Sequence, residues 1–420
     1  MADKITRRTV LKLGALSALS MGVEACGPSG DGQEDGTLAL QPPEGVDDQA
    51  WAGVRAQFAT APGLAYMNNA SLGMPPALVV EAVAAGYGRI SEEPLHGKHD
   101  LQEAIADEVM PGLSSLFGAI PSEMSLTRNA TEALHLQALG LKLGRGDEVL
   151  ITTQEHPAGS RPWQLRAARD GVRVTEVFIP SPLPPPEEVV ELVESAVGRT
   201  TRAIAFCHVT RGGHRYPVVD LCAMARSRGL LSLVDGAQAV GQFPIDLREL
   251  GCDAYSASLH KWMLGPVSTG FMFVREAARE QIVTTFAPDA TPASPQHAPG
   301  GTADFPVRAA IASSLDFVNM LGLDRVEARC RYLSDYLKGR LGELADVVPL
   351  SGHRDWSAPG QTIFEKVGLD AVAAVPLMEE VAAAHIDEHQ RDGHNAIRVS
   401  THVYNTTAEI DRLVDALTAV

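Results

Sequence analysis

The chain has 420 residues, of which 45% are apolar and 21% are charged, and its formal net charge is −17. This length is enough for two lobes and a large core, and the composition is that of an ordinary soluble globular protein. The negative charge argues against non-specific nucleic-acid binding. The five cysteines lack the C-x-x-C spacing of metal and redox motifs, so the sequence predicts neither a metal site nor a disulfide scaffold.

Residues 1–26 have the features of an export signal rather than of a folded element. Residues 6–12 include Arg7-Arg8 and closely resemble the twin-arginine motif, and the apolar stretch that follows is too short to span a membrane. Cys26 stands at a possible lipoprotein cleavage site, although Glu24 is unusual there, so lipidation stays open. We expect recognition by the twin-arginine export machinery and a location in the periplasm or cell envelope. Residues 27–50, rich in Gly, Pro and acids, are expected to be a flexible linker.

The globular part begins near residue 51 with helical patterns. Apolar spacing predicts helices at 79–89 and 101–117, with a solvated loop at 94–99 between them. Farther on, Asn129 can cap a helix that starts near Thr131. The free amides and positive dipole end at the start of this helix predict a phosphate site.

Strands and helices then alternate as far as residue 274. Short apolar runs predict strands at 148–153, 172–179, 203–209, 230–234, 253–258 and 270–274. This alternation, with a helix predicted at 187–197, favours a doubly wound sheet, which binds ligands at the carboxyl ends of its strands. Toward the C-terminus we expect helices at 309–320 and 408–420 and a strand at 397–405.

Two residues at that sheet edge carry the chemistry. Asp235 follows the strand at 230–234, and the strand at 253–258 delivers Lys261 to the same edge. A pyridoxal phosphate enzyme needs a lysine for a Schiff base and a carboxylate that keeps the pyridine nitrogen protonated, so that the ring can act as an electron sink. Taken singly, a strand-end acid is more often a cap and a lysine is more often solvated, so the two residues are informative only as a pair.

The strings D-G-A-Q at 235–238 and S-L-H-K at 258–261 together resemble the class V aminotransferase family of fold-type I pyridoxal phosphate enzymes. The resemblance covers most of the chain after about residue 60. It implies an α/β fold with a large domain at 51–310, whose first residues contribute to the small lobe. That domain would hold a mostly parallel seven-stranded sheet, and residues 311–420 would form a smaller α+β domain.

The resemblance also assigns roles to individual residues. Lys261 would carry the cofactor and act as the general base. Asp235 would bind the pyridine nitrogen and Gln238 the 3′ oxygen, while His156, in the string E-H-P-A at 155–158, would stack on the ring. The residues expected at the phosphate are Ala130, Thr131, Ser258, His260 and, from the neighbouring subunit, Thr302. A contribution from Thr302 requires a homodimer with a shared active site.

Substrate contacts are expected from three further residues. Arg398 begins an R-x-S-x-x-x-Y-N string and would grip the substrate carboxylate with its planar fork. Asn69 lies in a turn resembling one that approaches the family's active site, and Thr210, with Arg211 beside it, follows the strand at 203–209. A solvated strand position is the alternative for Arg398, and a plain turn is the alternative for Asn69. The loop at Thr210 and Arg211 departs from the family's usual pattern by about one residue.

The reaction stays open at this point. The chain resembles the isopenicillin N epimerase-like branch most closely, which implies proton transfer at the α-carbon of an amino-acid-type substrate. A carbon–sulfur β-lyase, an aminotransferase and a secreted binding protein without turnover are the alternatives. Desulfuration by a mobile-loop cysteine is disfavoured because no cysteine follows Cys330. Epimerisation needs an acid opposite Lys261, for which the candidates are His96, His99, His214 and Tyr404.

Overall fold

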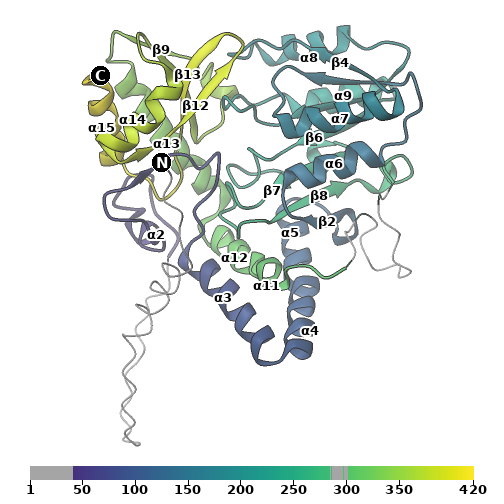
Figure 1. Ribbon diagram of the computed structural model, residues 1–420, viewed down its shortest axis with the longest axis horizontal. Coiled ribbons are helices and arrows are strands. Elements are labelled where there is room, and N and C mark those ends of the chain that lie inside the picture. Colours follow the sequence, from purple (N-terminus) through teal and green to yellow (C-terminus); the bar gives the residue numbers. More distant parts are fainter. Residues whose placement is uncertain (1–40, 284, 286–296, 298–300) are drawn as a thin grey trace, which may run out of the picture. The chain divides into compact units, whose positions relative to one another are not determined.

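The computed structural model describes residues 41–283, 285, 297 and 301–420 (Figure 1). The large lobe is built on a seven-stranded sheet with the spatial order β2-β8-β7-β6-β5-β3-β4. Its strands are β2 Met124–Thr127, β3 Glu148–Thr152, β4 Arg173–Val177, β5 Thr201–Cys207, β6 Leu231–Asp235, β7 Ala254–Ser258 and β8 Gly270–Val274. Neighbouring strands are parallel except at β8, which is antiparallel to both β2 and β7. The predicted mostly parallel seven-stranded sheet is confirmed.

Helices cover both faces of this sheet. Successive residues of one strand belong to different apolar clusters: Leu233 packs on one side and Val234 on the other. One face is covered by α6 Ala130–Gly140 and α7 Pro157–Asp170, and the other by α5 Met110–Leu116, α8 Pro186–Ser195, α9 Val218–Ser227 and α12 Ile311–Leu321. Burial on two faces explains why the central strands are continuous apolar runs rather than alternating ones.

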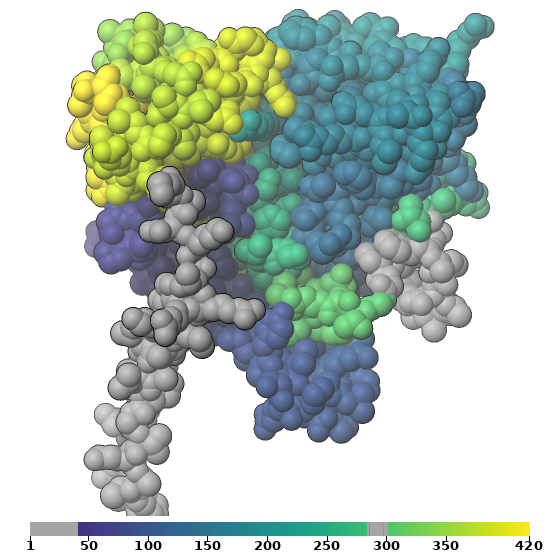
Figure 2. Space-filling model, in the orientation of Figure 1, coloured from purple at the N-terminus to yellow at the C-terminus, as the bar shows by residue number. Residues whose placement is uncertain are grey.

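The small lobe combines an antiparallel sheet with three helices (Figure 1). The sheet has the order β12-β13-β10-β9, and the helices pack on it and on each other. The elements are β9 Val347–Pro349, β10 Gln361–Lys366, β12 Asp387–Arg391, β13 His394–Ser400, α13 Leu323–Leu341, α14 Ala371–Ala382 and α15 Thr407–Thr418. The early strand β1 Ala65–Tyr66 pairs in parallel with β11 Ala384–His385. The small lobe is thus an α+β unit, and the start of the globular chain lies against it (Figure 2).

The hairpin β12–β13 joins the small lobe to the large one. Its turn is Asp392-Gly393, and both residues have positive φ, as a tight two-residue hairpin turn requires. Near the turn, Arg391 Nη2 donates to the carbonyl oxygen of Glu155 at 3.0 Å. His394 Nε2 lies 2.9 Å from the carbonyl oxygen of Ser181. The hairpin therefore contacts the large lobe just before His156.

The prediction of a loop at 94–99 is wrong. These residues form the start of α4 Pro94–Ala104, which follows α3 Ala77–Glu92 and continues through a π-helical turn, Ile105–Val109, into α5. Pro94 is compatible with helix because the first helical position needs no N–H partner. Gly97 does not break the helix. It is needed because a Cβ there would lie 2.6 Å from the carbonyl oxygen of Arg89 in α3.

The remaining short elements are α2 Ala52–Arg55, α10 Leu247–Leu250, α11 Phe305–Ala309 and the 3-10 turns Pro121–Glu123, Glu276–Ala278 and Arg354–Trp356. In the described part of the chain, no helix combines the length and the apolarity that a membrane span requires. The predicted export signal at 1–26, with Cys26, lies outside the described residues, as does most of the predicted linker at 27–50.

Candidate active site

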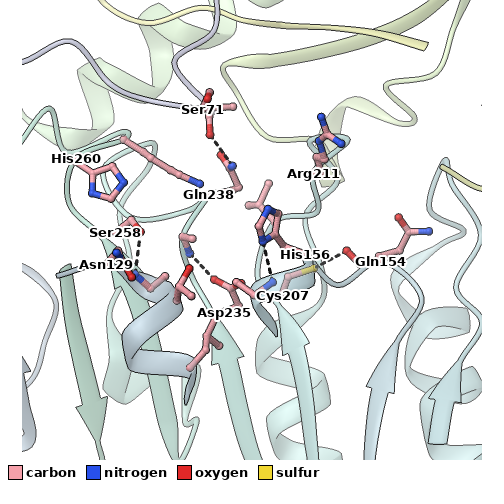
Figure 3. Close-up of a pocket in the computed structure, with 18 of the residues that line it drawn as sticks. Ser71, Asn129, Gln154, His156, Cys207, Arg211, Asp235, Gln238, Ser258 and His260 are labelled. Carbon is pink, nitrogen blue, oxygen red and sulfur yellow. Dashed lines mark hydrogen bonds between the residues drawn. The ribbon is translucent and has the colours of Figure 1, made fainter. Parts of the chain in front are cut away.

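A cavity of about 450 Å³ opens where the carboxyl ends of β3, β5, β6 and β7 meet the small lobe (Figure 3). Asp235, at the end of β6, has His156 beyond β3 on one side and Lys261 beyond β7 on the other. The lining residues are Ala70, Ser71, Asn129, Ala130, Thr131, Leu134, Gln154, His156, Ala158, Cys207, Val209, Arg211, Asp235, Ala237, Gln238, Ser258, His260, Lys261, Asp387 and Arg398. Among the described residues, no cluster of His, Cys, Asp or Glu is arranged to hold a metal ion.

The acid and the lysine expected to work together do face the same cavity. The carboxylate of Asp235 accepts the N–H of Ala237 at 2.9 Å and is 6% exposed. Burial raises the pKa of Asp235, against the opposing effects of that hydrogen bond and of Lys261. Burial also lowers the pKa of Lys261 to about 8, although the attraction of Asp235 works the other way. An amine with this pKa is partly unprotonated near neutral pH, as a nucleophile or base must be.

Hydrogen bonds orient the side chains of Gln238 and His156. Oε1 of Gln238 accepts the indole N–H of Trp262 at 2.9 Å and the amide of Gln361 at 3.2 Å. Its NH₂ group donates one hydrogen to the carbonyl oxygen of Ala70 at 2.8 Å, which leaves the second hydrogen to donate. His156 caps α7, and its Nδ1 accepts the N–H of Ala158 at 3.1 Å. Burial, reinforced by the charge of Lys261, lowers the pKa of His156 to about 4, so the ring is neutral near pH 7.

The start of α6 forms a second wall of the cavity. Asn129 caps this helix by accepting the N–H of Glu132 at 2.9 Å, as the sequence predicted. The N–H of Ala130 donates to the hydroxyl of Ser258 at 3.0 Å. His260 Nδ1 lies 3.1 Å from the carbonyl oxygen of Thr269, which leaves its Nε2 for another partner. Helix amides, a hydroxyl and an imidazole at one wall are the groups that bind a phosphate.

The third wall carries charged groups from both lobes. Arg398, on β13, is 3% exposed and donates to the carboxylate of Asp387 on the neighbouring strand. Arg211 reaches the same end of the cavity and donates to Glu388 Oε1 at 2.9 Å. Burial lowers the pKa of Arg398, but an arginine starts so high that it stays charged.

Two predicted residues do not reach this cavity, and a third, Thr302, was expected at the phosphate of the neighbouring subunit. Asn69 is buried behind the turn, where its Oδ1 accepts the hydroxyl of Tyr404 at 2.8 Å, and Ser71 lines the cavity instead. Thr210 Oγ1 accepts the backbone N–H of His214 at 3.0 Å. Thr302 is exposed on the surface of this chain.

The four candidates for an acid opposite Lys261 also lie elsewhere. His96 and His99 are exposed on α4, and neither lines the cavity. His214 is buried against the carbonyl oxygen of Leu350, and Tyr404 is held by Asn69.

Sequence reasoning missed several lining residues. The strand predicted to end at 209 ends at Cys207, whose burial was expected but whose position in the wall was not. Side chains alternate along an extended chain, so Cys207, Val209 and Arg211 face the cavity and Thr210 does not.

Asp387 was also missed, although a signal for it exists. The D-G pair at 392–393 predicts a two-residue hairpin, which places residue 391 opposite 394 and therefore residue 387 opposite Arg398.

Comparison with known proteins decides the family. The sequence profile of the family described as "Aminotransferase class-V" matches residues 65–413. The chain belongs to the class V aminotransferase family. This membership confirms the sequence-based resemblance, the fold-type I architecture and pyridoxal phosphate as the family's cofactor.

Curated members of the class V family that resemble this chain include two enzyme types. Isopenicillin N epimerase from Amycolatopsis lactamdurans is 30% identical over 390 residues, covering 88% of this chain and 98% of the relative. The enzyme of that name from Streptomyces clavuligerus is 28% identical, with the same coverage. A probable cysteine desulfurase from Halalkalibacterium halodurans is also 28% identical and covers 84% of this chain and 92% of the relative.

Solved structures of the class V fold superpose well. The cystine C-S lyase C-DES, in complex with its reaction product cysteine persulfide, has a TM-score of 0.76 at 23% identity and covers 84% of this chain and 96% of its own. The cysteine desulfurase CsdA from Escherichia coli has a TM-score of 0.76 at 21% identity and covers 88% of this chain and 98% of its own. At such low identity these likenesses establish the fold alone.

Proposed function

We propose that this protein is a pyridoxal phosphate enzyme that moves the α-proton of an amino-acid-type substrate, with epimerase-like chemistry. The observation that carries the proposal is the convergence of Asp235, Lys261, His156 and Arg398 on one cavity. When bound there, pyridoxal phosphate supplies the electron sink that makes an α-proton acidic. The same residues would serve the other reactions of the family, so the cavity supports the cofactor more strongly than the outcome.

The residues present fit this cofactor. The buried Asp235 is an acceptor for a protonated ring nitrogen, and the oriented NH₂ group of Gln238 is a donor for a ring oxygen. Thr131 at the start of α6, together with Ser258 and His260, would hold the phosphate. Arg398 would bind the substrate carboxylate.

Proton transfer on two faces would use residues from two walls. Lys261 follows β7, and its lowered pKa of about 8 suits a general base. His156 lies at the other side of Asp235, after β3. Its neutral ring carries hydrogen on Nε2, because Nδ1 accepts the N–H of Ala158. We propose His156, in place of the four distant candidates, as the acid opposite Lys261. Its ring must first take up a proton from solvent to become the imidazolium, because a neutral imidazole is too weak an acid to donate.

A carbon–sulfur β-lyase is the second candidate. It is favoured by the cysteine desulfurases among the relatives. It needs Lys261 to take the α-proton while the β-carbon–sulfur bond breaks, and the sulfur leaves as a thiolate that can accept this proton. Transamination stays a third outcome. The relatives are named as enzymes, so they give the binding-protein alternative no support.

One experiment separates these reactions. The loaded protein is incubated with a panel of amino acids in deuterated water, and α-deuteration, chirality and pyruvate are measured. Inverted chirality with α-deuteration supports the epimerase, and pyruvate release supports the lyase. His156→Phe keeps a flat ring, so an epimerase should retain deuteration by Lys261 but lose inversion. Inversion at the wild-type rate in this variant would contradict the role of His156.

The cofactor assignment has its own test. Lys261→Ala should abolish the long-wavelength absorbance band of the loaded protein. Survival of the band would contradict the role of Lys261, whatever the reaction is.

We also propose a homodimer with a shared site. Tyr87 on α3 donates to Asp304 at 2.6 Å, which fixes the exposed segment that contains Thr302. Tyr87 itself is 49% exposed, and Val80 and Leu95 nearby in sequence are 54% and 56% exposed, so apolar area is available for a partner. Light scattering should give the mass of a dimer, and a monomer at micromolar concentration would contradict the proposal.

Export through the twin-arginine route is proposed on the Arg7-Arg8 motif. Replacement of both residues by Lys should retain the protein in the cytoplasm, as measured by cell fractionation. Unchanged export would contradict the motif assignment.

A further inference from the structure

Arg398, proposed to bind the substrate carboxylate, already forms an ion pair with a carboxylate of the protein. Asp387 on β12 and Arg398 on β13 are direct partners in the antiparallel register. Nη2 of Arg398 donates to Oδ2 of Asp387, and both residues line the cavity. The side chain of Arg398 is 4% exposed and that of Asp387 is 23% exposed, so the acid lies on the solvent side of the pair.

A second arginine stands within reach of the same acid. Nη2 of Arg211 lies 3.4 Å from Oδ2 of Asp387 and 2.9 Å from Oε1 of Glu388. The carbonyl oxygen of Glu388 also accepts from Arg211, at 2.8 Å. Two guanidinium groups and two carboxylates therefore share this end of the cavity, and their formal charges cancel.

We propose that Asp387 is a built-in competitor for the carboxylate site of Arg398. The substrate carboxylate binds by displacing Asp387, and Arg211 holds the displaced acid. Asp387 is on this basis a specificity-determining residue for the proposed reaction, and the inference rests on the proposed role of Arg398.

The displacement follows from the burial of the pair. A carboxylate that approaches Arg398 without displacing Asp387 would place two anions on one guanidinium. A ligand that can offer two oxygens to the planar fork matches Asp387, whereas a neutral amide or hydroxyl does not. The need to displace Asp387 therefore weakens the binding of ligands with a neutral group more than that of ligands with a carboxylate. Once Arg211 holds both acids, the substrate group beside it is expected to be uncharged.

The test measures binding of propionate to the cofactor-loaded full chain by calorimetry. Propionate has a carboxylate and no amine, so it cannot react with the cofactor. Asp387→Asn removes the competing charge, and propionate should bind about tenfold or more tightly than to the wild type. Glu388→Gln is the matched control, because it removes the same charge from the next residue, which contacts Arg211 and not Arg398. It should change affinity by less than about threefold.

Two further variants make the outcomes distinct. Arg398→Lys should weaken propionate binding, and Asp387→Ser should repeat the gain of Asp387→Asn if the amide variant does not fold. If a folded Asp387 variant binds propionate no more tightly than the wild type, and Arg398→Lys still weakens binding, the role of Asp387 is wrong while the proposed role of Arg398 stands. If Arg398→Lys binds propionate like the wild type, the proposed substrate site falls, and the inference falls with it. Equal gains in Asp387→Asn and Glu388→Gln would also overturn it, because general electrostatics would then suffice.

Discussion

Glu155, the residue before His156, is expected to make stability depend on pH. Its side chain is 7% exposed, and Oε1 accepts the hydroxyl of Thr152 at 2.7 Å and the N–H of Cys207 at 3.1 Å. Burial raises the pKa of Glu155 from 4.5 to about 8, and these hydrogen bonds only partly oppose the effect. The folded protein therefore keeps a proton on Glu155 that the unfolded chain releases.

The sign follows from proton linkage. Above pH 4.5 the unfolded chain binds fewer protons at this group than the folded one, so the free energy of unfolding falls as pH rises toward 8 and then levels off. For a difference of one bound proton, the free energy of unfolding falls by up to about 3 kcal/mol between pH 5 and pH 7. Glu155→Gln keeps a neutral side chain of similar shape and removes this slope.

Urea unfolding of both proteins at pH 5, 6, 7 and 8 measures the difference. The wild type should lose stability relative to Glu155→Gln as the pH rises, whatever the other titrating groups contribute. Glu176→Gln on the edge strand β4 is the control, because it removes an exposed carboxylate. Parallel stability curves for the wild type and Glu155→Gln would refute the reasoning, because they would mean that Glu155 ionises equally in both states.

Two further predictions concern packing near Lys261. Gly73→Ala should cost more than about 2 kcal/mol in urea unfolding, because its Cβ would lie 1.9 Å from the carbonyl oxygen of Lys261. Gly339→Ala in α13 meets nothing within 4 Å and should instead stabilise by up to about 1 kcal/mol; a similar cost at both sites would contradict the clash. Trp262→Phe removes one of the hydrogen bonds that orient the amide of Gln238 and leaves those with Gln361 and Ala70. It should weaken cofactor affinity by up to about tenfold in an absorbance titration, whereas unchanged affinity would show that the remaining bonds orient the amide.

The sheet and its edge could be predicted from sequence because burial on two faces leaves a plain signal. The return strand predicted at 270–274 is β8 with the same bounds, and Asp235 ends β6 as expected. The directions of the side chains that follow a strand were harder to predict from the sequence. An error of two residues in the end of β5 moved attention from Cys207 to Thr210, because neighbouring side chains point in opposite directions.

Tertiary contacts caused the remaining errors. Pro94 and Gly97 suggested a loop locally, but the tight approach of α3 and α4 accounts for the glycine, and the proline fits a first helical turn. The pairing of Asn69 with Tyr404 joins residues 335 positions apart, and no local pattern reports it.

The pairing of β1 with β11 sets an order of assembly for the newly made chain. Residues 65–66 leave the ribosome long before their partners at 384–385 and the site residue Arg398. Because a growing chain cannot close the small lobe over the cavity before these segments appear, the complete binding site forms only after Arg398 has been made. A polypeptide truncated before residue 384 would keep the seven strands of the large sheet. It would lack the pairing of β1 with β11 in the small lobe, and it would lack Arg398.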